Sequence, residues 1–479
     1  MRKFIGREKE LQLLLEFTEK KTASFLIIMG RRRIGKSRLV EELAKHFTHF
    51  YTFTGLAPDH PMTKQEQLDE FSSQISTEFR TARAVYTDWR DAFHAVGERI
   101  QTGKTLLFFD EISWMGSEDP TFLAKIKDFW DLHLQKNPRL VFVVCGSASS
   151  WIEEKILANT GFVGRISHTL TLDELPLSDC SKFWPKHISA HEKLKILSIT
   201  GGIPKYLEEI RPHTGAEENI RRLCFTPGGF LFKEFDSIFK GIFLRSSEFY
   251  KSILRILAKG PRTQEQISRA LRFEKRPGRI AEYLQELELA GFITKDHPWN
   301  FKTTQDTRLR HYRLSDNYIR FYLKYIEKNQ SKIARNTFVF KSLTTLPEWN
   351  TIMGLQCENL VLHNRKHLRD LLKIPPEDVV CENPYFQKAT ARRPGCQIDY
   401  LIQTKFGNLY ACEIKFSQSP IGTSVIEEME KKCKALRLPR GFSIRPVLIH
   451  VNGVTEEVEN ADYFASIVDL GLLLQAPPK

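Results

Sequence analysis

The fold of the N-terminal part is constrained most strongly by one run of residues, Gly30-Arg31-Arg32-Arg33-Ile34-Gly35-Lys36-Ser37. The run has the spacing G-x-x-x-x-G-K-S, follows the apolar residues 25–28 and precedes a helical pattern at residues 38–43. Such a loop turns backbone N–H groups into a concavity, and its lysine adds a positive charge. The sequence therefore predicts a P-loop that binds ATP or ADP through this run and Arg38, with Lys36 at the β- and γ-phosphates and Ser37 on Mg²⁺.

The region around this loop alternates between strand and helix patterns. Apolar runs of strand length occur at residues 24–29, 49–54, 105–110 and 140–146, and helical patterns such as 37–47 and 122–134 lie between them. Strands separated by helices predict a parallel sheet covered on both faces. We therefore expect an α/β P-loop ATPase core over residues 1–175.

A second candidate element is the pair Asp110 and Glu111, which ends the apolar run at residues 105–109. In a P-loop protein the first carboxylate binds Mg²⁺ through water and the second orients the attacking water. The other interpretation is two solvated acids at a strand end. Two further candidates have equally open alternatives. Ser147 is either a sensor of the γ-phosphate or one of several serines that cap the next helix. Arg165 is either a charge-stabilising arginine or a surface residue.

Two further parts follow the core. Residues 176–246 read as a helical lid, interrupted at Gly201-Gly202-Ile203-Pro204. Residues 247–330 contain three short helical patterns (250–257, 264–271 and 280–290), with Thr263 and Gln266 placed for a capping box, and extended segments that start near residues 291 and 312. This order predicts a winged helix and a connecting helix. The part is basic, with Lys251, Arg255, Lys259, Arg262, Arg269, Arg272, Lys275, Arg276 and Arg279. Contact with DNA and a structural relay of the nucleotide state both remain open.

These motifs resemble, in their order, the archaeal-type ATPases of the STAND branch of the AAA+ superfamily. The resemblance rests on the segment Phe4-Ile5-Gly6-Arg7-Glu8-Lys9-Glu10-Leu11, the P-loop, Asp110-Glu111, Gly146-Ser147 and Gly202-Ile203-Pro204. It implies that Gly6, Arg7 and Pro204 border the nucleotide, with Pro204 near the adenine. It also implies a nucleotide-operated switch rather than a fast metabolic ATPase.

Residues 331–479 form a second predicted α/β region. We expect a long helix at 351–372, strands at 397–403, 408–415 and 446–451, and a helix at 424–436. Glu413 and Lys415 are two apart on a strand and share a face, and Asp399 lies on the neighbouring strand. Two carboxylates and a lysine in this arrangement are suited to Mg²⁺ binding and phosphodiester hydrolysis.

This arrangement resembles the PD-(D/E)xK superfamily, which implies a restriction-endonuclease-like domain. The resemblance also implies that Glu358, on the preceding helix, joins Asp399 and Glu413 as a metal ligand, with Glu413 and Lys415 catalytic. One departure is that Ile398, not proline, precedes Asp399. An ion network in an inactive domain is the alternative. Lys431, Lys432 and Lys434 follow a nucleic-acid backbone or simply form a solvated helix face.

Composition narrows the class of protein. The chain of 479 residues carries a net charge of +13, which favours DNA as a partner or simply keeps a large protein in solution. Its eight cysteines show no CxxC pair. Charged residues close to the start and the lack of a long apolar run predict a cytoplasmic protein without a membrane partner.

Three functions stay open at this level. The first is an ATP-regulated switch that interacts with DNA and carries a Mg²⁺-dependent nuclease domain. The second is a binding and signalling module without phosphodiester chemistry, with protein partners or self-association. The third is a DNA-binding ATPase that remodels a nucleoprotein complex.

Overall fold

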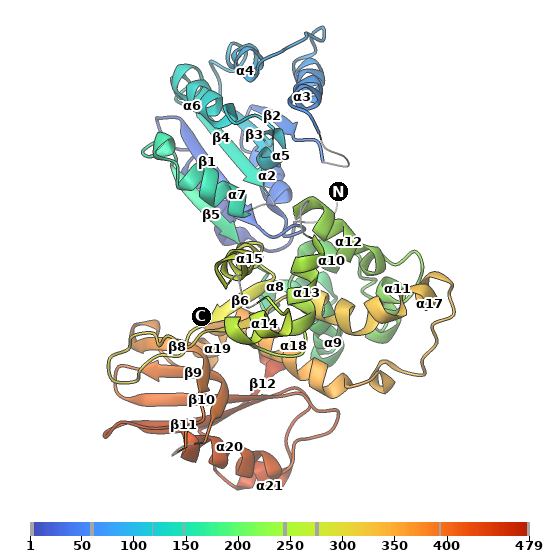
Figure 1. The fold of residues 1–479 in the computed structure, drawn as a ribbon, viewed down its shortest axis with the longest axis vertical. Coiled ribbons are helices and arrows are strands. Elements are labelled where there is room, and N and C mark those ends of the chain that lie inside the picture. Colours follow the sequence, from blue (N-terminus) through green and yellow to red (C-terminus); the bar gives the residue numbers. More distant parts are fainter. Residues whose placement is uncertain are drawn as a thin grey trace. The chain divides into compact units, whose positions relative to one another are not determined.

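The computed structural model describes residues 4–57, 62–116, 118–146, 149–242, 247–273, 277–391 and 394–476. The chain divides into two compact units (Figure 1). The first contains the residues up to Asp173 together with Asp236–Ser247 and Leu289–Gly291, and the second contains the rest. The finer division into four parts expected from the sequence stays a prediction.

A five-stranded parallel sheet forms the centre of the first unit. Its strands are β1 (Ser24–Gly30), β2 (His49–Thr54), β3 (Thr105–Asp110), β4 (Leu140–Gly146) and β5 (His168–Leu172), in the order β2-β3-β4-β1-β5. All four pairings are parallel, as the alternating pattern predicted. β1 and β4 are buried along their whole length, because helices cover both faces of a sheet of this kind.

Besides two 3-10 helices and a short π-helix, seven α-helices accompany this sheet in the described part of the first unit up to β5. They are α1 (Glu8–Glu16), α2 (Lys36–Ala44), α3 (Lys64–Phe79), α4 (Trp89–Gly97), α5 (Ile112–Met115), α6 (Phe122–Leu132) and α7 (Ser149–Ile152). One face of the sheet packs against a cluster of aromatic side chains. Phe53 and Phe142 contribute from strands, and Phe93 and Phe129 stack with their ring centres 4.9 Å apart between α4 and α6. This core fixes the strand ends, where parallel strands place their functional loops.

The chain then becomes helical until a short hairpin. The helices are α8 (Leu177–Cys180), α9 (Ala190–Thr200), α10 (Pro204–Glu208), α11 (Ala216–Cys224), α12 (Phe230–Ile242), α13 (Ser247–Leu257), α14 (Gln264–Ala270) and α15 (Pro277–Leu289). Thr263 caps α14, and Gln266 completes the predicted capping box. β6 (Ile293–Asp296) and β7 (His311–Leu314) pair antiparallel.

Two aromatic residues of the loop between β6 and β7 enter a hydrophobic core, whereas residues 302–306 are exposed. Trp299 and Phe301 are buried among residues of the C-terminal sheet, such as Ile398 and Leu401. Gln403 donates a hydrogen bond of 2.9 Å to the carbonyl of Phe301 and accepts one from the indole N–H of Trp299. The hairpin is therefore fastened to the C-terminal sheet by its own loop.

Two helices replace the single long helix that the sequence predicted at residues 351–372. α18 (Trp349–His363) ends at Asn364, and α19 (Arg365–Leu371) begins after it. The Asn364 side chain donates to the carbonyl of Leu360 and accepts from the backbone N–H of Leu177. The asparagine thereby satisfies a backbone N–H of a segment that is distant in the sequence. Such a long-range bond cannot be predicted from helical periodicity. The shorter helices α16 (Asn317–Phe321) and α17 (Gln330–Ala334) precede this pair.

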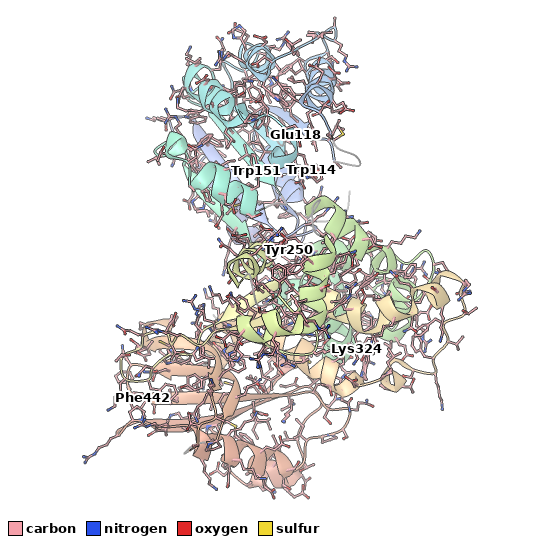
Figure 2. All side chains as sticks on the ribbon, viewed as in Figure 1. Trp114, Glu118, Trp151, Tyr250, Lys324 and Phe442 are labelled. Carbon is pink, nitrogen blue, oxygen red and sulfur yellow. The ribbon has the colours of Figure 1, made fainter. Side chains whose placement is uncertain are left out.

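A second five-stranded sheet ends the chain. Its strands are β8 (Val379–Gln387), β9 (Cys396–Thr404), β10 (Asn408–Lys415), β11 (Ser443–His450) and β12 (Ser466–Asp469), in the order β12-β11-β10-β9-β8. β8, β9 and β10 are antiparallel neighbours, whereas β10, β11 and β12 are parallel. α20 (Ser424–Ala435) connects β10 to β11, and α21 (Glu456–Asn460) precedes β12. Phe442, labelled in Figure 2, lies against the same core, with its ring centre 6.5 Å from that of Phe301.

Candidate nucleotide site and a second acidic site

The P-loop lies between β1 and α2, as predicted. Gly30 has φ 142°, and a Cβ at this position would lie only 2.6 Å from the carbonyl oxygen of Leu172 on β5. Arg33 and Gly35 also have positive φ, of 73° and 95°. Glycine at the two pattern positions is therefore required by the backbone, because an L side chain would be strained in both and would meet backbone at the first. The loop is built as a tight turn that leads its amides to the start of a helix.

Lys36 is buried inside this loop. Its Nζ donates hydrogen bonds of 2.8 Å and 3.3 Å to the carbonyls of Gly30 and Arg31. Burial lowers the pKa of Lys36, and the nearby carboxylate of Glu111 is the strongest group acting in the opposite direction. The ammonium group is thus held where the P-loop pattern requires a cation.

Ser37 and Asp110 meet although they are far apart in the sequence. The Ser37 hydroxyl donates a hydrogen bond of 2.6 Å to Oδ2 of Asp110, and Oδ1 of Asp110 accepts from the backbone N–H of Glu111 at 3.0 Å. Burial raises the pKa of Asp110, and the bond from Ser37 works against this shift. A hydroxyl and a carboxylate at one point are suitable ligands for Mg²⁺, which prefers oxygen. The residues present therefore fit this ion.

Glu111 is held in an unusual backbone conformation directly after β3. Its φ and ψ are 50° and 47°, and it forms the N-cap of α5. Left-handed backbone is uncommon for a residue with a side chain, and it occurs most often at functional turns. The bend places this carboxylate next to the P-loop lysine, as the electrostatic interaction with Lys36 indicates.

Gly6 and Arg7 lie beside the P-loop. Both have positive φ, and Arg7 is almost fully buried. The guanidinium of Arg7 donates to the carbonyl of Ile34 in the P-loop at 3.3 Å, to the carbonyl of Asp173, and to the carboxylate of Glu10 at 2.9 Å. Arg7 therefore joins the P-loop to the segment after β5.

The other predicted residues of this site have different surroundings. Nε and Nη2 of Arg165 donate to the two carboxylate oxygens of Asp131, at 2.8 Å and 2.7 Å. This bidentate pair fastens Arg165 to α6. Arg38 forms an exposed ion pair with Glu41 at 3.0 Å. Ser147 lies outside the described residues.

The Gly201-Gly202-Ile203-Pro204 turn belongs to the second unit and separates α9 from α10. The N–H of Gly202 donates to Glu174 at 2.7 Å, and its carbonyl accepts from the N–H of Leu175 at 2.8 Å. A Cβ at Gly202 would lie 2.3 Å from the carbonyl oxygen of Leu175. Pro204 is the first residue of α10, a position where its missing N–H costs nothing. The turn is therefore a close backbone-to-backbone contact followed by a helix start.

The predicted acidic site of the C-terminal sheet is assembled from three elements. Asp399 on β9 and Glu413 on β10 are buried on adjacent strands, and Oδ2 of Asp399 accepts from the N–H of Ile414 at 3.0 Å. α18, which carries Glu358, packs against β10. Burial raises the pKa of Asp399 well above its ordinary value, and the carboxylates of Glu413 and Glu358 raise it further. The three acidic side chains therefore share one electrostatic environment.

Positive groups surround these acids. Glu413 accepts hydrogen bonds from Lys415, at 3.1 Å, and from Lys432 on α20. Burial raises the pKa of Glu358, against the influence of Arg320 and Arg313. Lys415 also bonds Glu428 at 2.7 Å.

The carboxylates of Glu358, Asp399 and Glu413 do not lie close enough together to form a compact set of metal ligands. In the described ranges, one group of three His, Cys, Asp or Glu residues has all its ligand atoms within 4.8 Å of one another, and that group lies elsewhere, at His94, Glu98 and His133. Carboxylate oxygens are nevertheless the ligands that Mg²⁺ prefers, so the donor chemistry of Glu358, Asp399 and Glu413 fits this ion.

The N-terminal region matches a known domain family. The family described as an ATPase domain predominantly from Archaea covers residues 4–210, from the segment before Gly6 to a point beyond Pro204. Residues 4–210 are an archaeal-type P-loop ATPase domain. The match supports ATP binding and hydrolysis by this domain.

Three further similarities accompany the ATPase domain. An uncharacterized protein of Methanocaldococcus jannaschii is 28% identical over 375 residues, which is 78% of this chain and 79% of that protein. The Walker-type ATPase PABY2304 of Pyrococcus abyssi aligns with 67% of this chain and 96% of its own, at 18% identity and a TM-score of 0.49. The ORC2 protein of Aeropyrum pernix, solved with ADPNP and ADP, aligns with 70% of this chain and 97% of its own, at 15% identity and a TM-score of 0.40.

Lys432 is a member of the acidic site that was not singled out from the sequence. It was grouped with Lys431 and Lys434 as a basic helix face, but it points inward and is 28% exposed, against 77% for Lys434. A sequence signal did exist. Lys432 follows the buried Val425 and Met429 at helical spacing, which places it on the same face of α20.

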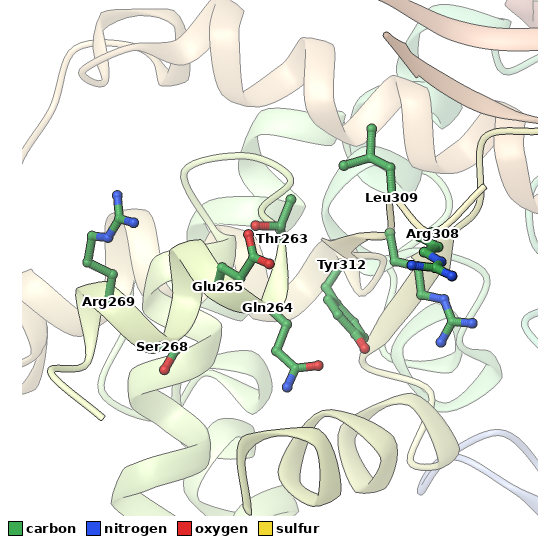
Figure 3. A pocket seen from close by; sticks show the side chains of 9 residues that line it. Thr263, Gln264, Glu265, Ser268, Arg269, Arg308, Leu309 and Tyr312 are labelled. Atoms are coloured by element: carbon green, nitrogen blue, oxygen red, sulfur yellow. The ribbon is translucent and has the colours of Figure 1, made fainter. Parts of the chain in front are cut away.

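An open pocket of about 670 Å³ lies between α14 and the residues before β7 (Figure 3). Arg269 and Arg308 lie at opposite ends of it, with Gln264 and Tyr312 between them. Arg310 also lines the pocket. Three arginines, set against one acidic lining residue, Glu265, make this pocket suited to an anionic ligand.

Throughout the described part of the chain, no helix is long and apolar enough to cross a bilayer.

Proposed function

We propose that this chain is an ATP-operated switch whose ATPase domain controls a second unit that contacts DNA and carries a Mg²⁺-dependent nuclease-like site. The observation that carries the proposal is the placement of Asp399 and Glu413, which are buried on the paired strands β9 and β10, with α18 and its Glu358 packed against β10. The same chain contains an ATPase domain. In this arrangement, ATP binding or hydrolysis in one domain would control the activity of a separate acidic site.

In the ATPase domain the P-loop residues and Arg38 contact the nucleotide, with Lys36 neutralising its phosphates. Ser37 and Asp110 would hold a Mg²⁺ ion, which would neutralise charge on the phosphates of the nucleotide. Glu111 orients the attacking water. The close Ser37–Asp110 pair and the buried Lys36 support this assignment. Following the STAND-like resemblance, Gly6, Arg7 and Pro204 border the nucleotide. Ser147 is the proposed sensor of the γ-phosphate. Arg165 is the proposed charge-stabilising arginine, a role in which it would have to leave its pair with Asp131.

Contact with DNA is assigned to the second unit. α13, α14, α15 and the β6–β7 hairpin form the proposed winged helix, and the pocket lined by Arg269, Arg308 and Arg310 receives the phosphate backbone. The net charge of +13 supports a polyanionic partner. Trp299 and Phe301 in the first part of the hairpin loop are packed into the C-terminal core, so we place the contact on α14 and on Arg308 and Arg310 in the last part of the loop.

In the nuclease-like site Glu358, Asp399 and Glu413 would hold Mg²⁺ once their carboxylates draw together around the ion. The ion would polarise the scissile phosphate and lower the pKa of a water. Lys415 lies beside Glu413 and positions the attacking water. Glu428, which pairs with Lys415 at 2.7 Å, limits the freedom of this ammonium group.

Incubation of the full chain with linear and circular DNA and Mg²⁺, with ATP, ADP or neither, tests the nuclease part. We expect cleavage that depends on the nucleotide and is lost in Asp399→Asn and Lys415→Ala. Lys434→Ala is the matched control, since Lys434 is exposed and pairs only locally with Glu430. No cleavage by the wild type in any nucleotide, or equal cleavage by Lys415→Ala, would refute this part.

One observation favours a second candidate function, a non-nucleolytic module that binds DNA or protein under ATP control, alone or by self-association. Both carboxylate oxygens of Glu413 are engaged by lysines, Lys415 and Lys432, which compete with a metal ion for the same lone pairs. This module predicts nucleotide-dependent binding or oligomerisation, measured by light scattering, with intact DNA at the end of the cleavage experiment.

A further inference from the structure

Three potential metal ligands converge at the carboxyl ends of α4 and α6, two helices of the ATPase domain. Both helices are labelled in Figure 1. Nδ1 of His94 lies 3.4 Å from Nε2 of His133, and the ligand atoms of His94, Glu98 and His133 all lie within 4.8 Å of one another. His94 and Glu98 are four residues apart, so they share one side of the helix end. None of these residues has a part in the proposed ATP or nuclease chemistry.

The separation of the two imidazoles suits a shared metal ion. Zinc bonds histidine nitrogen at about 2.0–2.1 Å, so two nitrogens on one tetrahedral ion lie about 3.3 Å apart. Without an ion, the same separation allows a hydrogen bond between the two rings, with the donor set by the tautomer. The ring planes are inclined at 67°, so the two rings meet at an angle instead of stacking.

The positions of the ligands are set by packed residues. Phe93 precedes His94, and Phe129 lies one helical turn before His133, and these two buried rings stack. Gly97 is required next to them, because a Cβ at this position would lie 2.6 Å from Cγ of His133. A glycine inside a helix is destabilising relative to alanine. Here it makes room for the imidazole between His94 and Glu98.

Two further features favour a cation at this place. Glu98 caps the carboxyl end of α4 and His133 caps that of α6, and helix carboxyl ends carry partial negative charge. Gln101 donates a hydrogen bond of 3.1 Å to Oε1 of Glu98, which orients the carboxylate. Outer groups of this kind hold metal ligands in position.

We propose that His94, Glu98 and His133 bind one divalent transition-metal ion, with zinc the best match to two imidazoles and a carboxylate, and that the ion joins α4 to α6. His94 and Glu98 are exposed and His133 is partly buried, so the fourth coordination position is open to water. The inference does not depend on the nuclease assignment or on ATP hydrolysis.

Titration of the untagged, chelator-treated full chain with Zn²⁺ tests the site, with excess Mg²⁺ present to occupy the oxygen sites. We expect one equivalent to bind with an affinity that falls more than tenfold in His94→Ala and in His133→Ala. The matched control is His213→Ala, from the exposed pair His187 and His213, whose ring centres are 6.5 Å apart. Circular dichroism checks that each variant is folded.

Two readouts separate this site from other zinc-binding groups, such as the partly exposed Cys396 and Cys433. Co²⁺ should give the absorption spectrum of nitrogen and oxygen ligands in the wild type, and Zn²⁺ should raise the melting temperature of the wild type but not of His133→Ala. Zinc affinity unchanged in both histidine variants, a thiolate-type Co²⁺ spectrum, or no zinc uptake by the wild type would overturn the proposal.

Discussion

The hydroxyl of Ser37 donates a 2.6 Å hydrogen bond to Asp110, which joins the first turn of α2 to the end of β3. β4 lies between β1 and β3 in the sheet, so the contact spans a whole strand. Because parallel strands end at one edge, the loop after β1 and the carboxylates after β3 can share a ligand. The ATPase site is thus a consequence of strand order.

Replacement of Glu111 by Gln should separate nucleotide binding from hydrolysis. The amide keeps the size of the side chain, so ATP binding should remain within about threefold of wild type, whereas loss of the group that orients water should slow turnover about 100-fold or more. Phosphate release and fluorescent-nucleotide binding measure the two effects. Glu118→Gln, an exposed acid in the same region, is the control. Undiminished turnover in Glu111→Gln would contradict the assigned role.

Gly202→Ala should destabilise the second unit. The new methyl group would lie 2.3 Å from the carbonyl oxygen of Leu175, so the two backbone segments must separate, at a cost of about 1–3 kcal/mol. Gly228→Ala is the matched control, because a Cβ there has no atom within 4 Å, and its effect should stay within about 0.5 kcal/mol. Urea unfolding measures both. Equal stability of the two variants would show that the turn adapts freely.

Asp399→Asn should raise stability in a pH-dependent way. Burial and the carboxylates of Glu413 and Glu358 raise the pKa of Asp399, so its proton is bound more tightly in the folded than in the unfolded chain. Such a group reduces the free energy of unfolding as pH rises above its unfolded pKa of about 4. Without divalent ions, the variant should therefore gain stability over wild type at pH about 8 and lose most of this gain near pH about 4.

Thermal melts at several pH values measure this difference, with Asp306→Asn as an exposed control. A gain that stays constant across the pH range would mean that ionisation of Asp399 is not its source.

Replacement of Lys432 and of Lys434 by methionine should lower the unfolding free energy by very different amounts. Lys432→Met removes one of the two cations that compensate the buried Glu413, which should cost about 1–3 kcal/mol of unfolding free energy. Lys434→Met removes an exposed pair with Glu430 on the same helix, with an expected effect below about 0.5 kcal/mol. Chemical denaturation compares them. Similar values for both variants would mean that Glu413 is compensated by Lys415 alone.

Much of the local structure was predictable from the sequence. The strands β2, β3, β4 and β10 have the expected bounds, and the Thr263–Gln266 capping box is present. These features depend on apolar runs and short-range bonds, which a sequence pattern contains. The meeting of Ser37 with Asp110 was expected because the P-loop pattern implies the sheet order.

What escaped prediction depends on distant partners. Asn364 ends α18 while bonded to Leu177, and Trp299 leaves its hairpin for the C-terminal core. β8 was missed because its residues are mostly half-exposed and lack a clear apolar alternation. The His94–His133 pair could not be predicted from the sequence, because the two helices that carry it meet only in the folded chain.

We propose that nucleotide in the ATPase domain controls contact of the second unit with DNA. The most direct measurement is the affinity of the full chain for a fluorescent DNA duplex at fixed salt, with ATP, with ADP and without nucleotide. The wild type should show affinities that differ at least tenfold between nucleotides, and Lys36→Ala should show one affinity in all three conditions. The control is Lys45→Ala. Lys45 is exposed at the end of α2, so this variant should show the same nucleotide-dependent DNA affinities as wild type. Wild-type affinity that is the same in ATP, in ADP and without nucleotide would contradict the claim.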